Sequence, residues 1–404
     1  MVNNQINKNT KQYAAPEAGS KLWNKYYCLI IAMACCTNFA NHFIGSSFSL
    51  WIVDMGRSNT IYGTIHSLFS LVAMLARPFT GWIIDHGNRK VAFIVSCIVY
   101  GTSLVLMLYS PIFGLFIGLR LIQGVGHGCI YTVCNNSGYD YMPPDKMEKG
   151  VGYLALSSSL VSALTASFSV STYQSKGPSA IVLYCVIAYV IAIILSLNVV
   201  FRTASDQRKF NIREVFNISN LFEKRALAPC ILSAFSVNFA FGLRSYIILY
   251  GRSMGFKNPG WFTTVSAIGL LVVRLVLDAI PKKEGSIKRR MTFAYAVFVV
   301  YLVLLFFCKN IYTFLFAAVL WAVVYGILDP QLQSMAIKSA PLERRGATGS
   351  TFLCSMDIGI ILGSFIGGVL ADKFGYQYMF IFAIIPVVLC IVYFLVSVSK
   401  KIEN

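Results

Sequence analysis

The stretch 77-RPFTGWIIDHGNRK-90 takes the chain from an apolar segment to a charged one. Apolar and small side chains lead to Asp85, and the basic pair Arg89-Lys90 follows within five residues. In a chain with few charges, this change of polarity predicts a membrane-spanning helix that ends at an aqueous surface. It also raises the question of what Asp85 does at that boundary.

The composition of the whole chain predicts a membrane protein. Of 404 residues, 57% are hydrophobic and 12% are charged, and the mean hydropathy of +0.67 lies outside the range of soluble domains. A hydrocarbon core ~30 Å thick needs about 20 mainly apolar residues per helix. On that measure we predict an all-α membrane protein with twelve spans, at 27–53, 61–84, 91–110, 112–137, 150–172, 179–201, 227–250, 261–280, 291–308, 311–337, 347–370 and 377–399.

The distribution of Lys and Arg predicts the orientation of these spans. Segments on the side of the N-terminus hold 24 of these residues, and the loops on the other side hold 6. Because cytoplasmic loops carry the excess of positive charge, both termini are expected in the cytoplasm. Topology therefore accounts for the net charge of +18, and no basic, aromatic surface remains for nucleic acid. Short loops fit a multi-pass protein of the plasma membrane, specifically a bacterial inner membrane.

The predicted spans divide into two groups of six, separated by the one long polar segment. We expect a cytoplasmic N-terminal tail without a signal peptide, an N-terminal half, a central cytoplasmic loop, a C-terminal half and a short C-terminal tail, at 1–25, 26–201, 202–225, 226–400 and 401–404. The eleven cysteines show no C-x-x-C or metal-ligand spacing, and no G-x-x-x-x-G-K-[ST] loop occurs. No metal, no cofactor and no direct use of ATP are expected.

Internal repetition at an offset near 200 residues supports the division into halves. Asn38-Phe39-Ala40 recurs as Asn238-Phe239-Ala240. The pattern Asp85-x-x-x-Arg89-Lys90 recurs as Asp278-x-x-x-Lys282-Lys283, again after the second span of its half. Two repeats at corresponding places indicate a duplicated architecture.

These features resemble the major facilitator superfamily of secondary transporters. The family signature after span 2, G-x-x-x-D-R-x-G-R-R/K, is matched by Gly81, Asp85, Arg89 and Lys90. The sequence departs from it at His86 and at Gly87-Asn88. The resemblance extends over nearly the whole chain after residue 25. It implies the major facilitator fold, a transporter and not an enzyme, and a monomer in the bilayer.

This resemblance suggests a role for Asp85 as a gate. Gly81 lets a neighbouring helix approach closely, and Asp85 can then face the positive N-terminal end of that helix. By resemblance this helix is span 11, starting near residues 346–348, and the contact closes the cytoplasmic side. The predicted gating residues are Gly81, Asp85, Arg89, Lys90 and Asp278. Alternatively, Asp85 and Arg89 only mark the water interface.

Spans 4 and 5 carry the signatures that bear on proton coupling. Arg120-x-x-Gln123-Gly124-x-Gly126 is similar to the family's R-x-x-Q-G-x-G motif, whose arginine is tied to proton coupling in related antiporters. Alternatively, Arg120 has no role in proton coupling and only holds helices together through hydrogen bonds. Span 5 lacks the G-x-x-x-G-P-x-x-G motif of proton-coupled exporters, because Thr165-Ala166 and Ser169 stand in place of its Gly-Pro and Gly. Close packing is still expected there, without a proline kink.

Charged residues inside apolar spans are costly, so each predicts a cavity or a partner. Asp357 in span 11 is the main candidate for a protonatable group, or else it forms a salt bridge with Arg244 or another cation. Asp329, directly before Pro330, is a second candidate for a protonatable group. Alternatively, it only forms hydrogen bonds with backbone groups freed by the proline. Arg244 either binds an anionic substrate or forms half of an ion pair.

Neutral polar residues complete the candidate path. The repeated Asn of spans 1 and 7 lies near the expected symmetry axis, where transporters of this type bind substrate. Such residues also serve as contacts between helices. With Arg244, the candidate substrate-binding residues are Asn38, Asn41, His42, Gln123 and Asn238.

Three functions are compatible with this pattern. The first is proton-coupled export of a small organic molecule, with Asp357, Arg120 and Asp329 in proton coupling. The second is import or facilitated movement of an anionic metabolite, favoured by Arg120 and Arg244. The third, a membrane-embedded enzyme or receptor, predicts a nucleophile with its base or a large extra-membrane domain, and the sequence contains neither.

Overall fold

The protein folds as a bundle of long helices in a computed structural model. The model describes residues 16–17, 19–86, 88–201, 223–279, 286–340 and 345–398, and these ranges contain helices and no strand. The first part comprises α1 (Lys25–Asp54), α2 (Asn59–His86), α3 (Arg89–Leu108), α4 (Phe113–Asp140), η1 (Pro144–Lys146) and α5 (Met147–Leu197). The second part begins with η2 (Lys224–Ala226), α8 (Leu227–Leu232), η3 (Ser233–Asn238), α9 (Phe239–Arg244) and α10 (Ile247–Ser253). It continues with α11 (Trp261–Ala279), α12 (Ser286–Phe306), α13 (Ile311–Lys338), α14 (Arg345–Phe374), α15 (Tyr376–Phe382), α16 (Ile384–Tyr393) and η5 (Phe394–Val398).

The predicted twelve spans are confirmed by these helices. Nine helical segments of the described chain are long and apolar enough to cross a membrane. One of them, within α5, contains two crossings separated by Gly177, where the backbone leaves the helical region. The helices α2 and α11 complete the twelve. Span 7 is the most irregular, because α8 continues through the π-helix η3 into α9 and then turns into α10.

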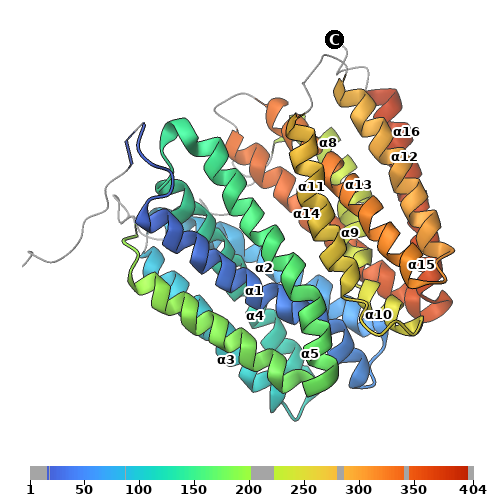
Figure 1. The fold of residues 1–404 in the computed structure, drawn as a ribbon, viewed down its shortest axis with the longest axis horizontal. Coiled ribbons are helices and arrows are strands. Elements are labelled where there is room, and N and C mark those ends of the chain that lie inside the picture. Colours follow the sequence, from blue (N-terminus) through green and yellow to red (C-terminus); the bar gives the residue numbers. More distant parts are fainter. Residues whose placement is uncertain are drawn as a thin grey trace, which may run out of the picture.

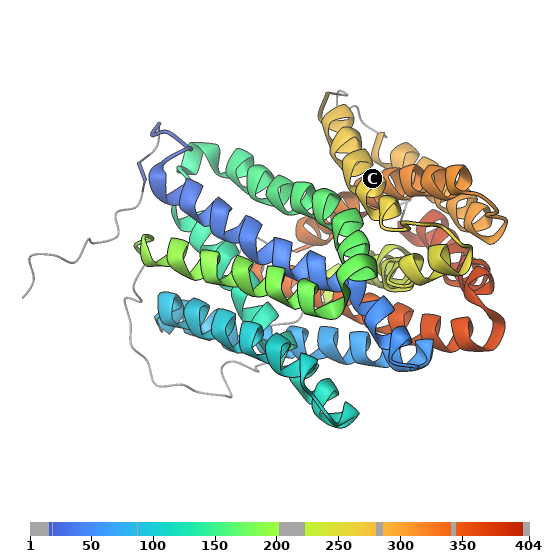
Figure 2. The same ribbon diagram turned by 60° about the horizontal axis from the view of Figure 1, so that its bottom comes forward.

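The two halves lie side by side. Figures 1 and 2 show α1–α5, coloured blue to green, as one group and α8–η5, coloured yellow to red, as the other. We call these groups the N-half and the C-half. We call the end of the bundle at which α1 begins the terminal end, and the opposite end, at which α1 is followed by α2, the distal end.

Glycines at the distal end repeat between the halves. Gly56 and Gly255 follow the first span of each half, with φ of 73° and 78°. Gly177 and Gly375 lie before the last span of each half, with φ of 72° and 92°. These backbone conformations favour glycine because it has no Cβ. The offsets of 199 and 198 residues agree with the duplication indicated by the sequence.

Local capping fixes several helix ends. The side chains of Asn24, Asn88 and Asn310 each accept a hydrogen bond from a backbone N–H in the first turn of α1, α3 and α13, respectively. These bonds satisfy donors that have no partner inside the helix. Within η1, Asp145 accepts a hydrogen bond from the Gly19 N–H, and this hydrogen bond holds the pKa of Asp145 below its usual range.

Two helix pairs make most of the contact between the halves. The helix α2 packs along α14, and α5 packs against α11. Gly260 lies so close to α5 that a Cβ there would come within 2.7 Å of the Ala166 carbonyl oxygen. Close packing of span 5 on span 8 therefore occurs without the Gly-Pro signature, and α5 has no kink before Gly177.

Candidate functional site

The distal end of the interface between the halves is closed by polar contacts. Asp372, in the last turn of α14, accepts hydrogen bonds from the backbone N–H groups of Asn59 and Thr60 at 3.0 and 2.7 Å. It also accepts bonds from the Asn59 amide and the Thr60 hydroxyl at 2.9 and 2.6 Å. A negative group is favourable at this position because α2 presents the positive end of its dipole there. We call this set of contacts the distal latch.

Close helix approach accompanies the distal latch. A Cβ on Gly368 would lie 2.6 Å from the Asn59 carbonyl oxygen. The Tyr246 hydroxyl donates to the Ser364 carbonyl at 2.6 Å and is 3.3 Å from the Asn59 carbonyl. Nearby, Arg252 and Asp54 form an ion pair of 2.7 Å across the halves.

The α5–α11 side of the distal end is closed in the same way. Asn258 donates to the carbonyl and hydroxyl oxygens of Ser167 at 3.1 and 3.0 Å. Deeper in the bundle, the Thr264 hydroxyl donates to the Ala163 carbonyl at 2.7 Å. Both sides of the interface therefore hold hydrogen bonds between the halves at this end.

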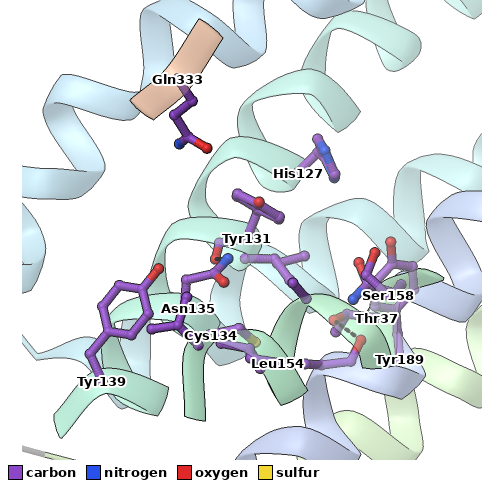
Figure 3. Close-up of a pocket in the computed structure, with 15 residues that line it drawn as sticks. Thr37, His127, Tyr131, Cys134, Asn135, Tyr139, Leu154, Ser158, Tyr189 and Gln333 are labelled. Carbon is purple, nitrogen blue, oxygen red and sulfur yellow. Dashed lines mark hydrogen bonds between the residues drawn. The ribbon is translucent and has the colours of Figure 1, made fainter. Parts of the chain in front are cut away.

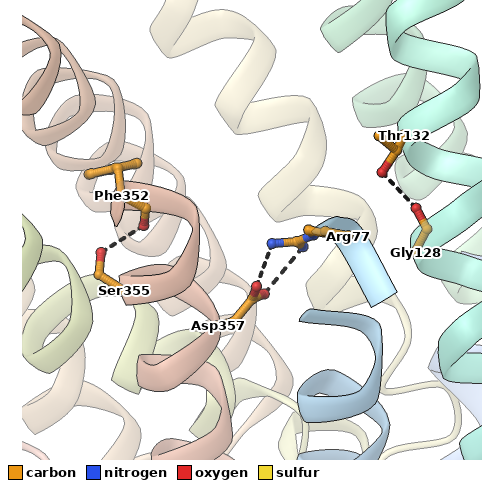
Figure 4. A network of polar contacts seen from close by, with 6 residues as sticks. All are labelled: Arg77, Gly128, Thr132, Phe352, Ser355 and Asp357. Carbon is orange, nitrogen blue, oxygen red and sulfur yellow. Dashed lines mark hydrogen bonds and ion pairs between the residues drawn. The ribbon is translucent and has the colours of Figure 1, made fainter. Parts of the chain in front are cut away.

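The contacts between α2 and α14 continue from the distal latch into the middle of the bundle. His66 and Ser364 form a hydrogen bond of 3.1 Å, and Ser67 donates to the Ile361 carbonyl at 2.8 Å. Further toward the terminal end, Arg77 forms an ion pair with Asp357 (Figure 4). Both terminal nitrogens of the guanidinium, Nη1 and Nη2, donate to the carboxylate. Asp357 thus has a cation as its partner, and this cation comes from the opposite half.

A polar cavity lies in the terminal half of the bundle. Its volume is about 260 Å³, and most of its lining comes from α1, α4 and α5. Gln333 reaches it from α13 on the opposite half (Figure 3). The lining is neutral and rich in hydrogen-bonding groups, since this described surface includes no Asp, Glu, Lys or Arg. Its polar side chains are Thr37, Asn38, His127, Tyr131, Asn135, Tyr139, Ser158, Tyr189 and Gln333.

Comparison with known proteins agrees with this architecture. The family model described as Major Facilitator Superfamily matches residues 29–349 and 286–404. The chain belongs to the major facilitator superfamily. It is therefore a multi-pass membrane transporter of small molecules, not an enzyme.

Similar transporters of this superfamily are named for export. The staphylopine export protein of Staphylococcus aureus is 24% identical over 358 residues, which cover 86% of this chain and 89% of that protein. A chloramphenicol efflux pump of Mycobacterium tuberculosis is 26% identical over 333 residues, 78% of each chain. Among solved structures, the nucleoside transporter NupG superposes with a TM-score of 0.73 at 12% identity, covering 92% of this chain and 98% of that one. This last likeness shows the fold alone.

Arg120 of this facilitator-superfamily transporter is held by aromatic rings. Its guanidinium carbon lies 4.2 Å from the ring centre of Phe48 and 4.3 Å from that of Phe69. It donates to Gln123 at 2.7 Å, and Gln123 in turn contacts the sulfur of Met107. Cation–π contacts stabilise the charge in an apolar surrounding. Gln123 is fully buried and does not line the cavity in this conformation, so its role in substrate binding stays a prediction.

Arg244 and Asp329 lie in the C-half of the transporter. The guanidinium carbon of Arg244 is 5.4 Å from the ring centre of Phe241 and 5.8 Å from that of Trp321. No carboxylate of the described residues is within ion-pair distance of Arg244. Asp329 has one buried carboxylate oxygen without a hydrogen-bond partner and interacts electrostatically with Arg274.

The four remaining substrate candidates occupy different surroundings. Asn38 lines the cavity. His42 is partly buried and lies within electrostatic range of Arg244, and Asn41 is partly buried beside it on α1. Asn238 is 1% exposed and donates to Ser233 within η3. These positions make Asn38 and His42 the better placed candidates for contact with a substrate.

The predicted gating residues are described only in part. Arg89 forms an ion pair with Asp140 at the end of α4, and Lys90 donates to the Leu197 carbonyl at 3.1 Å. Both contacts lie within the N-half. The side chains of residues 81–87 and 278–279 lie outside the described part of the structure. The role predicted for Gly81, Asp85 and Asp278 therefore stays a prediction.

Arg77 and Asp372, which make charged contacts between α2 and α14, were not among the sequence candidates. Arg77 begins the stretch that decided the fold, and the cost of a charge inside a span applies to it as it does to Arg120. Asp372 follows Gly368 by four residues, which is the spacing of Gly81 and Asp85. The charge of Arg77 inside a span and the spacing of Gly368 and Asp372 were both visible in the sequence.

Proposed function

We propose that this transporter exports a small organic molecule by alternating access, in exchange for protons. The observation that carries the proposal is the ion pair between Arg77 and Asp357, because it joins the two halves inside the membrane. Addition of a proton to Asp357 removes its charge and with it the Coulomb attraction to Arg77. The interface between α2 and α14 then loses one of its contacts, so proton binding changes the relative stability of the two access states.

The position of the cavity supports the half of the transport cycle in which substrate is loaded. The distal end is closed by the distal latch and by the Arg252–Asp54 pair. The polar cavity lies on the terminal side of these contacts. If the termini are cytoplasmic, as the distribution of Lys and Arg predicts, this is the state that loads substrate from the cytoplasm. The names of the relatives, an export protein and an efflux pump, agree with export.

Residues keep in this proposal the roles that the sequence predicts for them. Asp357 carries the proton, and Arg120 and Asp329 support its movement. Asn38, Asn41, His42, Gln123, Asn238 and Arg244 form the substrate path. At the cytoplasmic face, Gly81, Asp85, Arg89, Lys90 and Asp278 close the transporter when the distal end opens. The transporter acts as a monomer in a bacterial plasma membrane.

The proposal is tested in inside-out membrane vesicles with an acidified lumen and a pH-sensitive dye. Staphylopine and chloramphenicol, the compounds named for the relatives, are added outside. Export predicts that the lumen becomes more alkaline as the compound enters. Asp357→Asn is expected to abolish the proton flux, because its side chain does not ionise.

Asp145→Asn is the matched control. It removes a carboxylate that lies outside the membrane-spanning helices and bonds Gly19 within the N-half. Full proton flux is expected in this variant. Uptake of a compound that continues unchanged after an ionophore collapses the proton gradient would contradict proton coupling.

A further inference from the structure

Arg244 is a cation inside the membrane that has no carboxylate partner among the described residues. Arg77 is paired with Asp357. Arg120 also lacks a carboxylate among the described residues, but it is 3% exposed and enclosed by Gln123 and two rings. Arg244 is only partly buried, and its two ring contacts, at 5.4 and 5.8 Å, are longer than the 4.2 and 4.3 Å contacts of Arg120. Since Arg274 interacts with the Asp329 carboxylate, Arg244 is the described cation of this region that remains accessible to a bound molecule.

Aromatic side chains surround Arg244 on the C-half. Trp321 and Tyr325 are stacked, with ring centres 5.7 Å apart, and Tyr325 is also 5.7 Å from Phe241. We call Arg244, Phe241, Trp321 and Tyr325 the arginine box. Phe241 and Tyr325 are partly exposed, so their rings offer a flat surface beside the guanidinium.

The arginine box faces the N-half near the polar cavity. Tyr325 lies within electrostatic range of Tyr131, which lines the cavity. Arg244 is likewise in range of His42 on α1. The box therefore occupies the central region between the halves. Ser245 and Tyr246, which directly follow Arg244, contact α2 near its N-terminus. The distal latch closes the bundle at that N-terminus, on the distal side of the box.

Around Tyr325 the described charged groups are two arginines, Arg244 and Arg274, and one carboxylate, Asp329, so their net charge is positive and favours an anion. An unpaired guanidinium in an apolar surrounding is unfavourable by several kcal/mol relative to a paired one. The described lining of the cavity contributes no carboxylate that would attract a cationic molecule. A carboxylate matches the planar guanidinium with two parallel hydrogen bonds, and an unsaturated group next to it stacks on the rings.

We propose that the substrate is an organic acid whose carboxylate binds Arg244 within the arginine box. Its neutral, hydrogen-bonding remainder occupies the adjacent cavity. This inference rests on the proposed function only in taking the cavity as the substrate path. It is independent of the direction of transport and of proton coupling.

The test compares two probes that differ in one substituent, a carboxylate in 4-nitrobenzoate and a neutral amide in 4-nitrobenzamide. Both carry a nitroaromatic ring that quenches tryptophan fluorescence on contact, and Trp321 lies in the arginine box. Binding is measured at equilibrium on the purified full-length protein in detergent at pH 7, without a proton gradient. The dissociation constant of the acid is expected to be at least about tenfold lower, because a charge-assisted, bidentate bond is stronger than a neutral one.

Three variants locate the effect. Arg244→Gln is expected to remove the preference for the acid, and Arg244→Lys is expected to keep part of it, because the charge remains while the planar fork is lost. Arg57→Gln is the matched control. Its guanidinium carbon also lies over a ring, 4.2 Å from the centre of Phe113, but at the exposed distal end. This variant is expected to bind both probes as the wild type does.

Equal affinity of the two probes for the wild type, or no saturable quenching by the acid, would overturn the inference. A preference for the acid that survives in Arg244→Gln would overturn it as well. These outcomes are separate from a failure of the proposed function. Loss of proton-coupled export in vesicles leaves the binding result intact, and the absence of acid preference leaves coupled export intact.

Discussion

Replacement of Asp372 by alanine tests whether the distal latch holds one access state. The carboxylate accepts four hydrogen bonds from Asn59 and Thr60, two of them from backbone N–H groups at the start of α2. The loss of a capping side chain costs about 0.5–2 kcal/mol, and the loss of a negative charge at a helix N-terminus costs about 0.3–1 kcal/mol. Because Asp372 is exposed to solvent, we expect a total of about 2 kcal/mol, not the full sum of four bonds.

This free energy changes the distribution of access states. The four bonds join opposite halves, so they are lost when the distal ends separate. A loss of about 2 kcal/mol multiplies the ratio of distal-open to distal-closed molecules by about 30. The ratio is measured by electron paramagnetic resonance, with spin labels on genetically encoded amino acids at Lys176 and Lys309. Both positions are exposed at the distal end, one on each half.

Asp145→Ala provides the control for this measurement. It also removes a carboxylate that accepts a backbone N–H bond, from Gly19 at 3.0 Å, but donor and acceptor belong to the same half. The distance distribution is expected to match that of the wild type. A change of less than about twofold in the Asp372→Ala ratio would refute the idea that the latch stabilises the distal-closed state.

Two further predictions concern the same interface. Gly368→Ala places a Cβ 2.6 Å from the Asn59 carbonyl oxygen, so it is expected to raise the distal-open fraction in the same distance measurement. Gly101→Ala, where no atom lies within 4 Å of the new Cβ, is expected to leave that fraction unchanged, and a shift of equal size in both variants would contradict the steric reason. Arg77→Gln leaves the buried Asp357 without its partner, which costs about 3–5 kcal/mol, and Asp357→Asn leaves the part-exposed Arg77 without its partner, which is expected to cost less. The double variant is expected to show a smaller loss of melting temperature than the sum of the two single variants, and additive losses would show that the pair is not coupled.

The sequence was sufficient to predict the spans because their length is set by the bilayer. The predicted range 311–337 corresponds to α13, Ile311–Lys338, and 27–53 corresponds to α1, Lys25–Asp54. Apolar length and polar boundaries are local properties of the chain. The tight turn between spans 5 and 6, made by Gly177 with its backbone outside the helical region, depends on backbone geometry that composition does not report.

The partner of Asp357 could not be assigned in the same way. Asp357 lies twelve residues after the start of α14, and Arg77 lies nine residues before the end of α2. At 1.5 Å per residue both are at a similar depth from the terminal end. Depth alone also admits other cations, because the choice depends on which helices of the two halves face each other. The sequence left Arg244 or another cation as the partner of Asp357. The interface between α2 and α14 makes Arg77 that partner.

The distal latch gives the opening stretch of the sequence a counterpart in the structure. Gly368 lets α14 approach the first residues of α2, and Asp372 then bonds the N–H groups at the α2 N-terminus. The predicted contact of Gly81 and Asp85 with the N-terminus of α14 uses the same two residue types, at the same spacing, between the same two helices, at the opposite end. The helices run antiparallel, so the N-terminus of each lies at the end of the pair where the other helix ends. One helix pair therefore carries the elements for closing either end, and a group between the two ends, such as the Arg77–Asp357 pair, is in a position to influence both.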